Sequence, residues 1–482
     1  MTPPSPAARN AFLTIAISLI AAAAAVAGFI AGRSTVHDAY VQKVRTFITT
    51  ENTMTTLYAA LGAQLDDPVT ADGLAKLYGV RPGDRAALTE RLRGVAWVPA
   101  YRPAPFVGQL ARPVLGDDPH INVLGFRDER STYVTKAPRT VRIFLTGGSV
   151  AWGSGAPSQQ STISYQLERL LNERLAPRTK VRYEVVNTAF PAWSTTHEKL
   201  LIQQRLVDMH PDVILMFSGN NDVHWSRDGR DVRWFDTPMD ENQLLLRNEL
   251  YRSSGHADWT VAAPAQSVPA SCPDLARITA RNVAEAAAAA AGAHARLIFA
   301  LQPNVATSAK RLTVREDRLP EAHNRPYWES CYGALRAALG AIHAQNYRFV
   351  DLSRSFGGVD AATELFVDSY HLGDLGNRLI AEDLAGKIGW REIAPGPAVA
   401  ADPAESLTIV SLQSDGGTLR IVPNRFDKNL LVVVDKELLP TAVAPDAVSA
   451  AIPAALPPGE HAVAIVDGMT GTASPPVSFR RP

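Results

Sequence analysis

Apolar and polar positions follow two alternating periods along residues 141–388. Short runs rich in apolar and β-branched residues predict five buried strands, at 141–147, 183–189, 212–219, 296–303 and 347–353. Between them, apolar side chains recur at helical spacing, which predicts helices at 161–175, 197–209, 274–295, 326–345 and 375–388. Ser161 is the predicted N-cap of the first helix. Because strands and helices alternate strictly, and the strands are apolar on both faces, we predict a parallel sheet covered by helices, a three-layer α/β/α fold.

The N-terminus has a different pattern. The 22 residues from 11 to 32 carry no charge, and a helix of that length crosses the hydrocarbon core of a bilayer. We predict an uncleaved signal anchor that holds the rest of the chain outside the cytoplasm, in the periplasm or at the cell surface. A cleaved signal peptide and a buried core helix are the alternatives.

Changes in composition along the rest of the chain predict the boundaries of its domains. Residues 37–95 predict two helical stretches, a stalk or a helical cap, to which we assign no chemistry. Residues 223–273 are polar and predict an inserted loop or lid. Beyond residue 407, short β-branched segments between turn residues predict a β-sandwich of immunoglobulin-like size. The predicted domains are an anchor at 1–35, a helical stalk and proline-rich linker at 36–120, an α/β domain at 121–392, a linker at 393–406 and the sandwich at 407–482.

Charge and cysteine content narrow the function classes. Lys plus Arg and Asp plus Glu both number 48, and no long basic run occurs, which argues against nucleic-acid binding. The two cysteines, Cys272 and Cys331, would form a disulfide in an oxidising compartment, although two separate buried thiols fit equally well. Neither has a second Cys or His at metal-ligand spacing, so no metal site is predicted.

A candidate nucleophile follows the first strand. Ser149 comes directly after Gly147 and Gly148, which allow a sharp strand-to-helix turn. A serine hydroxyl needs a base to take its proton. His371, just before the last helix, is the candidate base, and Asp368, three residues earlier, can orient its imidazole.

An acyl-transfer site also needs donors for the oxyanion. The Asn221 side chain after the third strand, the Ser149 N–H and the Ala192 N–H after the second strand are the candidates. Each residue alone has a simpler interpretation, as a turn residue or a helix cap, but the combination favours a triad. Asp222 is expected to bond nearby backbone, and His197 and His224 are interpreted as polar surface.

These blocks resemble the SGNH/GDSL hydrolase superfamily over roughly residues 120–390. GGS at 147–149, NTAFPAWS at 187–194, GNND at 219–222 and DSYH at 368–371 correspond to its four blocks, and LGFRDER at 124–130 to a lead-in found in many bacterial members. The resemblance implies a flavodoxin-like hydrolase domain. Two departures are Gly148, where the family usually has Asp, and Ala192, where it has Gly, which puts the oxyanion geometry in question.

The resemblance implies a serine esterase that acts on acyl, chiefly acetyl, esters of cell-surface polysaccharide without metal or cofactor. A polysaccharide O-acyltransferase would use the same site. A non-catalytic carbohydrate-binding or assembly protein is the alternative from another class, with the C-terminal β-domain contacting protein or glycan. Trp152, Trp193 and Trp225 each follow a block within four residues and would either form a substrate rim or simply pack.

Overall fold

The computed structural model describes residues 54–482, apart from 105, 117, 234–237, 262–269 and 416. The predicted anchor at 11–32 lies outside the described residues. Residues 54–241 and 264–482 belong to one compact unit and residues 242–263 to another. Within the part of the chain that the structure describes, no helix is both long enough and apolar enough to cross a bilayer.

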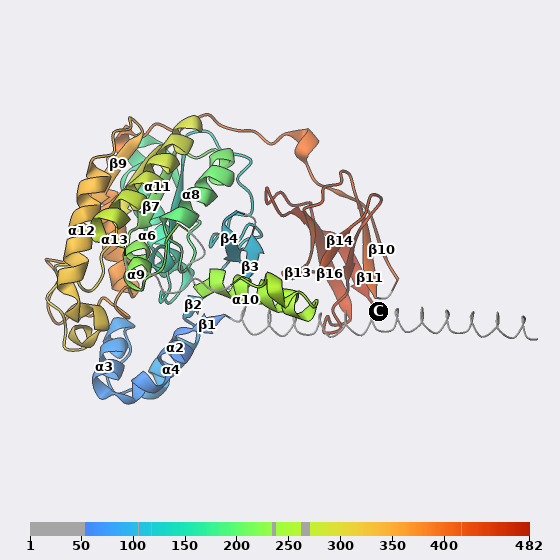
Figure 1. The fold of residues 1–482 in the computed structure, drawn as a ribbon. Helices are drawn as coiled ribbons and strands as arrows, with labels where there is room; N and C mark the ends of the chain where they lie inside the picture. Colours follow the sequence, from blue (N-terminus) through green and yellow to red (C-terminus); the bar gives the residue numbers. More distant parts are fainter. Residues whose placement is uncertain (1–53, 105, 117, 234–237, 262–269, 416) are drawn as a thin grey trace, which may run out of the picture. The chain divides into compact units, whose positions relative to one another are not determined.

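A five-stranded parallel sheet forms the centre of the α/β domain, as predicted (Figure 1). Its order is β6-β5-β7-β8-β9, and every residue of β5 and β7 is buried. In chain order this is 2-1-3-4-5, a doubly wound arrangement in which ligands bind at the carboxyl ends of the strands where the order reverses. That switch point lies between β5 and β7. The strands are β5 (Thr140–Gly147), β6 (Arg182–Asn187), β7 (Val213–Ser218), β8 (Arg296–Leu301) and β9 (Tyr347–Asp351).

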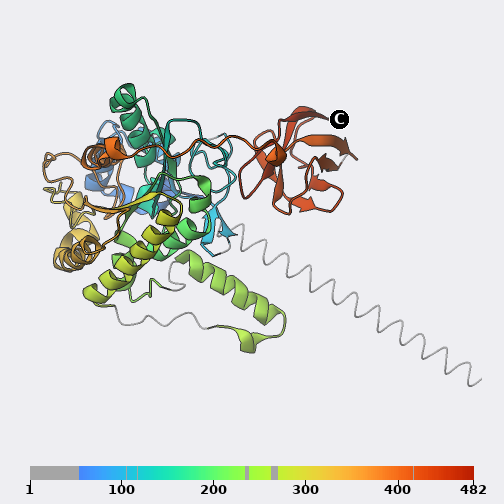
Figure 2. The same cartoon turned by 90° about the horizontal axis from the view of Figure 1, so that it is seen from above.

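Helices cover the sheet, which confirms the predicted layers. In one layer α6 (Ile163–Arg174) packs with α13 (Asp374–Lys387), and in the other α11 lies between α8 and α12 (Figures 1 and 2). The bounds of these three are α8 Thr195–Gln204, α11 Cys272–Gly292 and α12 Arg325–Gly340. The N-cap prediction for α6 is wrong by one residue. Thr162 has the extended backbone of a cap and accepts from Tyr165 N–H, whereas Ser161 ends a preceding 3-10 turn.

The segment before the sheet is a cap and not a separate stalk. Two short strands, β1 (Thr55–Thr56) and β2 (Ala96–Val98), pair with each other around the helices α2 (Leu57–Leu61), α3 (Pro68–Leu77) and α4 (Arg85–Arg93). Their apolar side chains form a small core that also takes in Val367 of the α/β domain. We call residues 55–98 the N-terminal cap. The predicted proline-rich linker contains an antiparallel hairpin of β3 (Tyr101–Ala104) and β4 (Gly108–Ala111).

The insertion between β7 and β8 contains helices and is not simply a loop. It contains α9 (Asn220–Arg227) and α10 (Pro238–Ser253). Cys272, the first residue of α11, is joined by a disulfide to Cys331 in α12. The bond ties together two helices of the same layer across 59 residues of sequence.

The C-terminal region is a β-sandwich, as the pattern beyond residue 407 predicted. Two antiparallel sheets, β10-β11-β15-β14 and β13-β12-β16-β17, enclose an apolar core that includes Leu419, Val432 and Ile465. Its longer strands coincide with β-branched runs of the sequence and are β10 (Ile409–Ser414), β11 (Thr418–Pro423), β12 (Leu430–Val434) and β16 (Gly459–Asp467). The other four are β13 (Glu437–Leu439), β14 (Thr441–Val443), β15 (Val448–Ala451) and β17 (Val477–Arg481).

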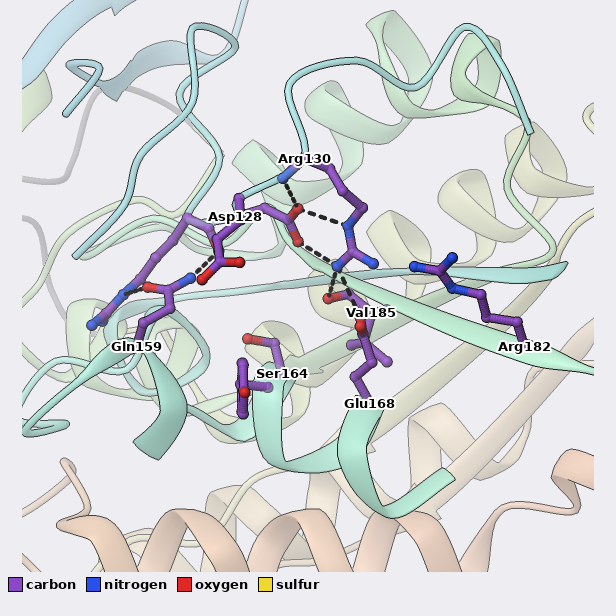
Figure 3. A pocket seen from close by; sticks show the side chains of 10 residues that line it. Asp128, Arg130, Gln159, Ser164, Glu168, Arg182 and Val185 are labelled. Atoms are coloured by element: carbon purple, nitrogen blue, oxygen red, sulfur yellow. Dashed lines mark hydrogen bonds and ion pairs between the residues drawn. The ribbon is translucent and has the colours of Figure 1, made fainter. Parts of the chain in front are cut away.

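At the β6 edge of the parallel sheet, charged side chains bind backbone groups of the strand. Figure 3 shows Arg130 between Asp128 and Glu168, with ion pairs of 2.7 and 2.8 Å. Arg130 also donates to the carbonyl oxygen of Val185, and Glu168 accepts from the N–H of the same residue. These bonds occupy edge groups that could otherwise pair with another chain. The adjoining pocket of about 170 Å³ is not lined by any of the three predicted triad residues.

Candidate active site

The nucleophile lies where β5 ends at the switch point of the sheet. Gly147 has φ +153°, and a Cβ at this position would lie 2.4 Å from the carbonyl oxygen of Phe217, so any side chain would clash. Gly148 precedes α5 (Ser149–Trp152), and a Cβ there would lie 2.3 Å from Nδ2 of Asn221. The missing side chain at Gly148 therefore makes room for Asn221 beside Ser149.

Arg127, in the lead-in motif, fixes the other end of this short helix. Its guanidinium is buried and donates to the carbonyl oxygens of Trp152 and Gly153 at 3.0 and 3.1 Å. Burial lowers the pKa of Arg127 to about 10, so the group still carries its charge at neutral pH. A buried cation on the last carbonyl groups of a helix satisfies acceptors that have no partner within the helix.

The structure brings Ser149, His371 and Asp368 together in one chain of hydrogen bonds. Nε2 of His371 lies 2.7 Å from Oγ of Ser149, and Nδ1 lies 2.7 Å from Oδ2 of Asp368. The proton is assigned to Nδ1, because a carboxylate only accepts. Nε2 is then the acceptor for the serine hydroxyl. The imidazole connects two residues that are 219 positions apart in sequence, which supplies the geometry that proton transfer requires.

Asp368 is held in its ionised form. Burial alone would raise its pKa. The neighbouring His371 imidazole, together with hydrogen bonds from that imidazole and from the backbone N–H groups of His371 and Tyr370, outweighs burial, so the pKa lies below its usual value. Oδ1 accepts both backbone N–H groups at 2.8 Å. The turn is closed by Val367 N–H donating to the His371 carbonyl oxygen. We call residues 365–373 the acid–base loop.

Asn221 lies beside Gly148 and bonds the turn that contains Ala192. Nδ2 of Asn221 donates to the carbonyl oxygen of Trp193 at 2.8 Å, and Nε1 of Trp225 donates to that of Ala192 at 3.0 Å. Ala192 has φ +68°, the left-handed conformation that favours glycine. The Gly-to-Ala departure therefore keeps a glycine-like backbone at a cost of about 1–2 kcal/mol, and the backbone N–H is retained.

Two buried carboxyl groups support the nucleophile side. Asp222 is fully buried and accepts from the N–H and Oγ1 of Thr195 and from Oγ1 of Thr279. Burial raises the pKa of Asp222 against these hydrogen bonds. Glu198, which the sequence did not single out, is buried below β5 and accepts from Oγ1 of Thr146 at 2.7 Å. Burial raises the pKa of Glu198 to about 8, so it is largely protonated at neutral pH.

A second polar network, which no sequence pattern indicated, joins α9 to the acid–base loop. The Tyr370 hydroxyl lies 3.0 Å from Nδ1 of His224 and donates to Glu321 at 2.9 Å. Glu321 also pairs with Arg227 and accepts from Nε1 of Trp328. Burial would raise the pKa of Glu321, but these hydrogen bonds lower it to about 2, so the group is ionised.

The interpretation of His197 and His224 as polar surface residues is wrong. The side chain of His224 is 22% exposed, and burial lowers its pKa. His197 is buried, stacks on Trp193 and caps α8 by accepting from Ser194 N–H at its Nδ1. Neither has an acidic residue at the three-residue spacing of Asp368 and His371, so the local sequence did not suggest a buried role for them.

The proposed tryptophan rim also needs correction. Trp152 and Trp193 are 0% exposed and pack against Phe190, so the packing interpretation holds for them. Trp225 is half-buried beside Ala192. Trp97 does contact the proposed base, and its ring centroid lies 4.6 Å from that of His371. It comes from the N-terminal cap, to which the sequence assigned no chemistry.

Among the described residues, no group of three or more His, Cys, Asp or Glu side chains is arranged to hold a metal ion. The polar groups of the site are the oxygen and nitrogen atoms of Ser149, His371, Asp368 and Asn221. They are arranged for proton transfer and hydrogen bonding.

No family model matches the chain, and no curated protein matches it. Among solved structures, it is similar to Axe2, an acetylxylan esterase from Geobacillus stearothermophilus, with 12% identity, 52% of this chain and 94% of that chain covered, and a TM-score of 0.32. It is also similar to the acetyl xylan esterase AlAXEase, with 14% identity, 52% of this chain and 100% of that chain covered, and a TM-score of 0.30. A third similar structure is LAE5, an alpha/beta hydrolase from the metagenome of Lake Arreo in Spain. Its identity is 15%, 52% of this chain and 97% of that chain are covered, and the TM-score is 0.31. Likeness at these values does not indicate a substrate for this chain.

Proposed function

We propose that the chain is a serine esterase of the SGNH/GDSL type that cleaves acyl esters with Ser149, His371 and Asp368. The observation that carries this is the pair of 2.7 Å contacts on the two nitrogens of His371, one to Ser149 and one to Asp368. A helix cap or a turn serine does not require this arrangement. The four sequence blocks of the superfamily support the same function.

The mechanism follows from the roles of these atoms. Nε2 of His371 takes the hydroxyl proton as Oγ of Ser149 attacks the ester carbonyl carbon, and ionised Asp368 stabilises the imidazolium. The oxyanion receives hydrogen bonds from Asn221 Nδ2 and the N–H groups of Ser149 and Ala192. His371 then protonates the leaving alcohol, and water, activated by the same imidazole, releases the acid and restores the serine.

For the substrate we propose small acyl esters, chiefly acetyl esters, on polysaccharide outside the cytoplasm. The disulfide between Cys272 and Cys331 supports an oxidising compartment. The uncharged segment at 11–32 supports attachment to a membrane. If a sugar hydroxyl replaced water in the second half of the reaction, the same residues would perform acyl transfer.

A fluorophosphonate probe tests the nucleophile. We expect wild type to be labelled and Ser149→Ala not to be. Ser158→Ala, which removes another hydroxyl of the same segment that contacts Ser161, is the matched control and should label normally. A folded wild-type protein that stays unlabelled would contradict the esterase and favour a carbohydrate-binding protein.

Acetylated oligosaccharides test the substrate and the direction of transfer. Release of acetate by wild type and not by His371→Ala supports the esterase, and equal release by both would remove the proposed base. An acceptor oligosaccharide added to the same assay distinguishes hydrolysis from transfer, because transfer yields a newly acetylated sugar instead of free acetate.

A further inference from the structure

Trp97 brings the N-terminal cap into contact with the proposed base. It lies on β2, and its ring makes an angle of 61° with the imidazole of His371 at a centroid distance of 4.6 Å. Both imidazole nitrogens are already engaged by Ser149 and Asp368. The indole therefore covers a part of the imidazole that neither hydrogen bond uses, and the His371 side chain is left only 11% exposed.

The cap is held from both sides of the site. On the nucleophile side, Ser154 Oγ donates to the carbonyl oxygen of Trp97 at 2.5 Å, and the Tyr78 hydroxyl donates to that of Gly155 at 2.7 Å. On the other side, Val367 of the acid–base loop is buried in the apolar core of the cap. Because the cap touches the segments that carry both the nucleophile and the base, the position of Trp97 is tied to both.

The charge on the base gives this contact a chemical role. His371 becomes positively charged when it takes the proton of Ser149. The face of an aromatic ring attracts a cation within about 6 Å of its centroid, and the attraction is larger where water is excluded. If the esterase function proposed above holds, the transition state contains such a cation beside Trp97.

We propose that Trp97 is a positioning residue of this site. Its ring fixes the imidazole between Ser149 and Asp368 and stabilises the positive charge that forms there. The N-terminal cap is then a part of the active site, although it lies outside the four sequence blocks. This assigns a function to a segment that the sequence left without one.

Two substitutions of Trp97 in the full chain distinguish the effect of the aromatic ring from the effect of side-chain size. Trp97→Leu, which removes the aromatic face, should lower kcat for p-nitrophenyl acetate about five- to tenfold with KM within about twofold. The acidic limb of kcat/KM should move about half a pH unit lower, because a less stabilised imidazolium forms less readily. Trp97→Phe should retain most of the activity. Tyr58→Leu, which removes a cap ring that contacts Arg93, is the matched control and should leave kcat unchanged.

The outcomes distinguish this inference from the function on which it rests. Trp97→Leu with wild-type kcat and an unmoved acidic limb, in an enzyme that Ser149→Ala inactivates, overturns the role of Trp97 alone. Equal losses in Trp97→Phe and Trp97→Leu, together with a lowered thermal midpoint, show a purely structural residue and also overturn it. A wild type without turnover or probe labelling removes the esterase and the role of Trp97 together.

Discussion

The two halves of the proposed site are built in different ways. Ser149 is positioned by the chain next to it, because β5 is buried along its whole length and ends in two glycines that admit no side chain. The acid–base loop has no such local support. Its carbonyl oxygens at Phe366 and Val367 accept from Arg315, and the N–H groups of Leu365 and Phe366 donate to Glu316.

This difference predicts which substitutions should disturb each half of the site. The nucleophile side depends on backbone geometry, so its sequence can be recognised from a few adjacent residues. The acid–base loop depends on buried charges about 50 residues earlier in the chain, so substitutions far from His371 should disturb it. Glu316 pairs with Lys310 at 2.6 Å, and both side chains are fully buried. Each half can be tested separately.

Removing either reacting group should have the largest effect. We expect Ser149→Ala and His371→Ala each to lower kcat by about 10⁴-fold or more, and the double variant to lose no more than either single one, because the two residues act as a unit. The hydrolysis rate of p-nitrophenyl acetate gives both numbers. Losses that multiply in the double variant would mean that the two residues act independently.

The buried charges that hold the acid–base loop come next. Glu316→Ala would leave Lys310 buried without its partner and two loop N–H groups without an acceptor, so the free energy of unfolding should fall by about 3–5 kcal/mol. Thermal unfolding and kcat should both show the loss. Lys387→Met, which breaks an exposed pair with Asp383, is the control and should cost less than about 0.5 kcal/mol. A mild effect of Glu316→Ala would contradict the dependence of the loop on distant charges.

Glu198 should make the nucleophile side sensitive to pH. Its folded pKa, raised to about 8 from 4.5 when unfolded, means that the folded state binds the proton more tightly. The stability is therefore fully present below pH 4.5 and is lost as the pH rises from there to 8. Glu198→Gln keeps an uncharged oxygen for Thr146, so the thermal midpoint of this variant should decline less over that window. Parallel pH curves for the two proteins would show that Glu198 is not protonated in the fold.

The smallest expected effect is at Ala192. Ala192→Gly relieves the left-handed strain at φ +68° and should raise the free energy of unfolding by about 1 kcal/mol. Turnover should change by less than about twofold, because the N–H stays in place. Thermal unfolding and kcat measured on the same preparation test both statements, and a loss of stability would show that the methyl group contributes packing that outweighs the strain.

Local patterns in the sequence were enough to predict the five strands and the flanking helices of the α/β domain, and to single out Ser149, Asp368, His371 and Asn221 as candidates. Strand and helix periods are properties of neighbouring residues, and the glycines before Ser149 are needed for a turn within that same segment. Asp368 and His371 are three residues apart, so their mutual contact is also local. These features could therefore be found without coordinates.

Only the tertiary structure decided the surroundings of these residues. Trp97 meets His371 across 274 residues of sequence, and Glu316 bonds Phe366 across 50. Trp152 and Trp193 looked like a rim because they follow functional blocks, yet both are buried. The physical reason is that burial and long-range contacts depend on which elements pack together, and periodicity within one element carries no record of its partners.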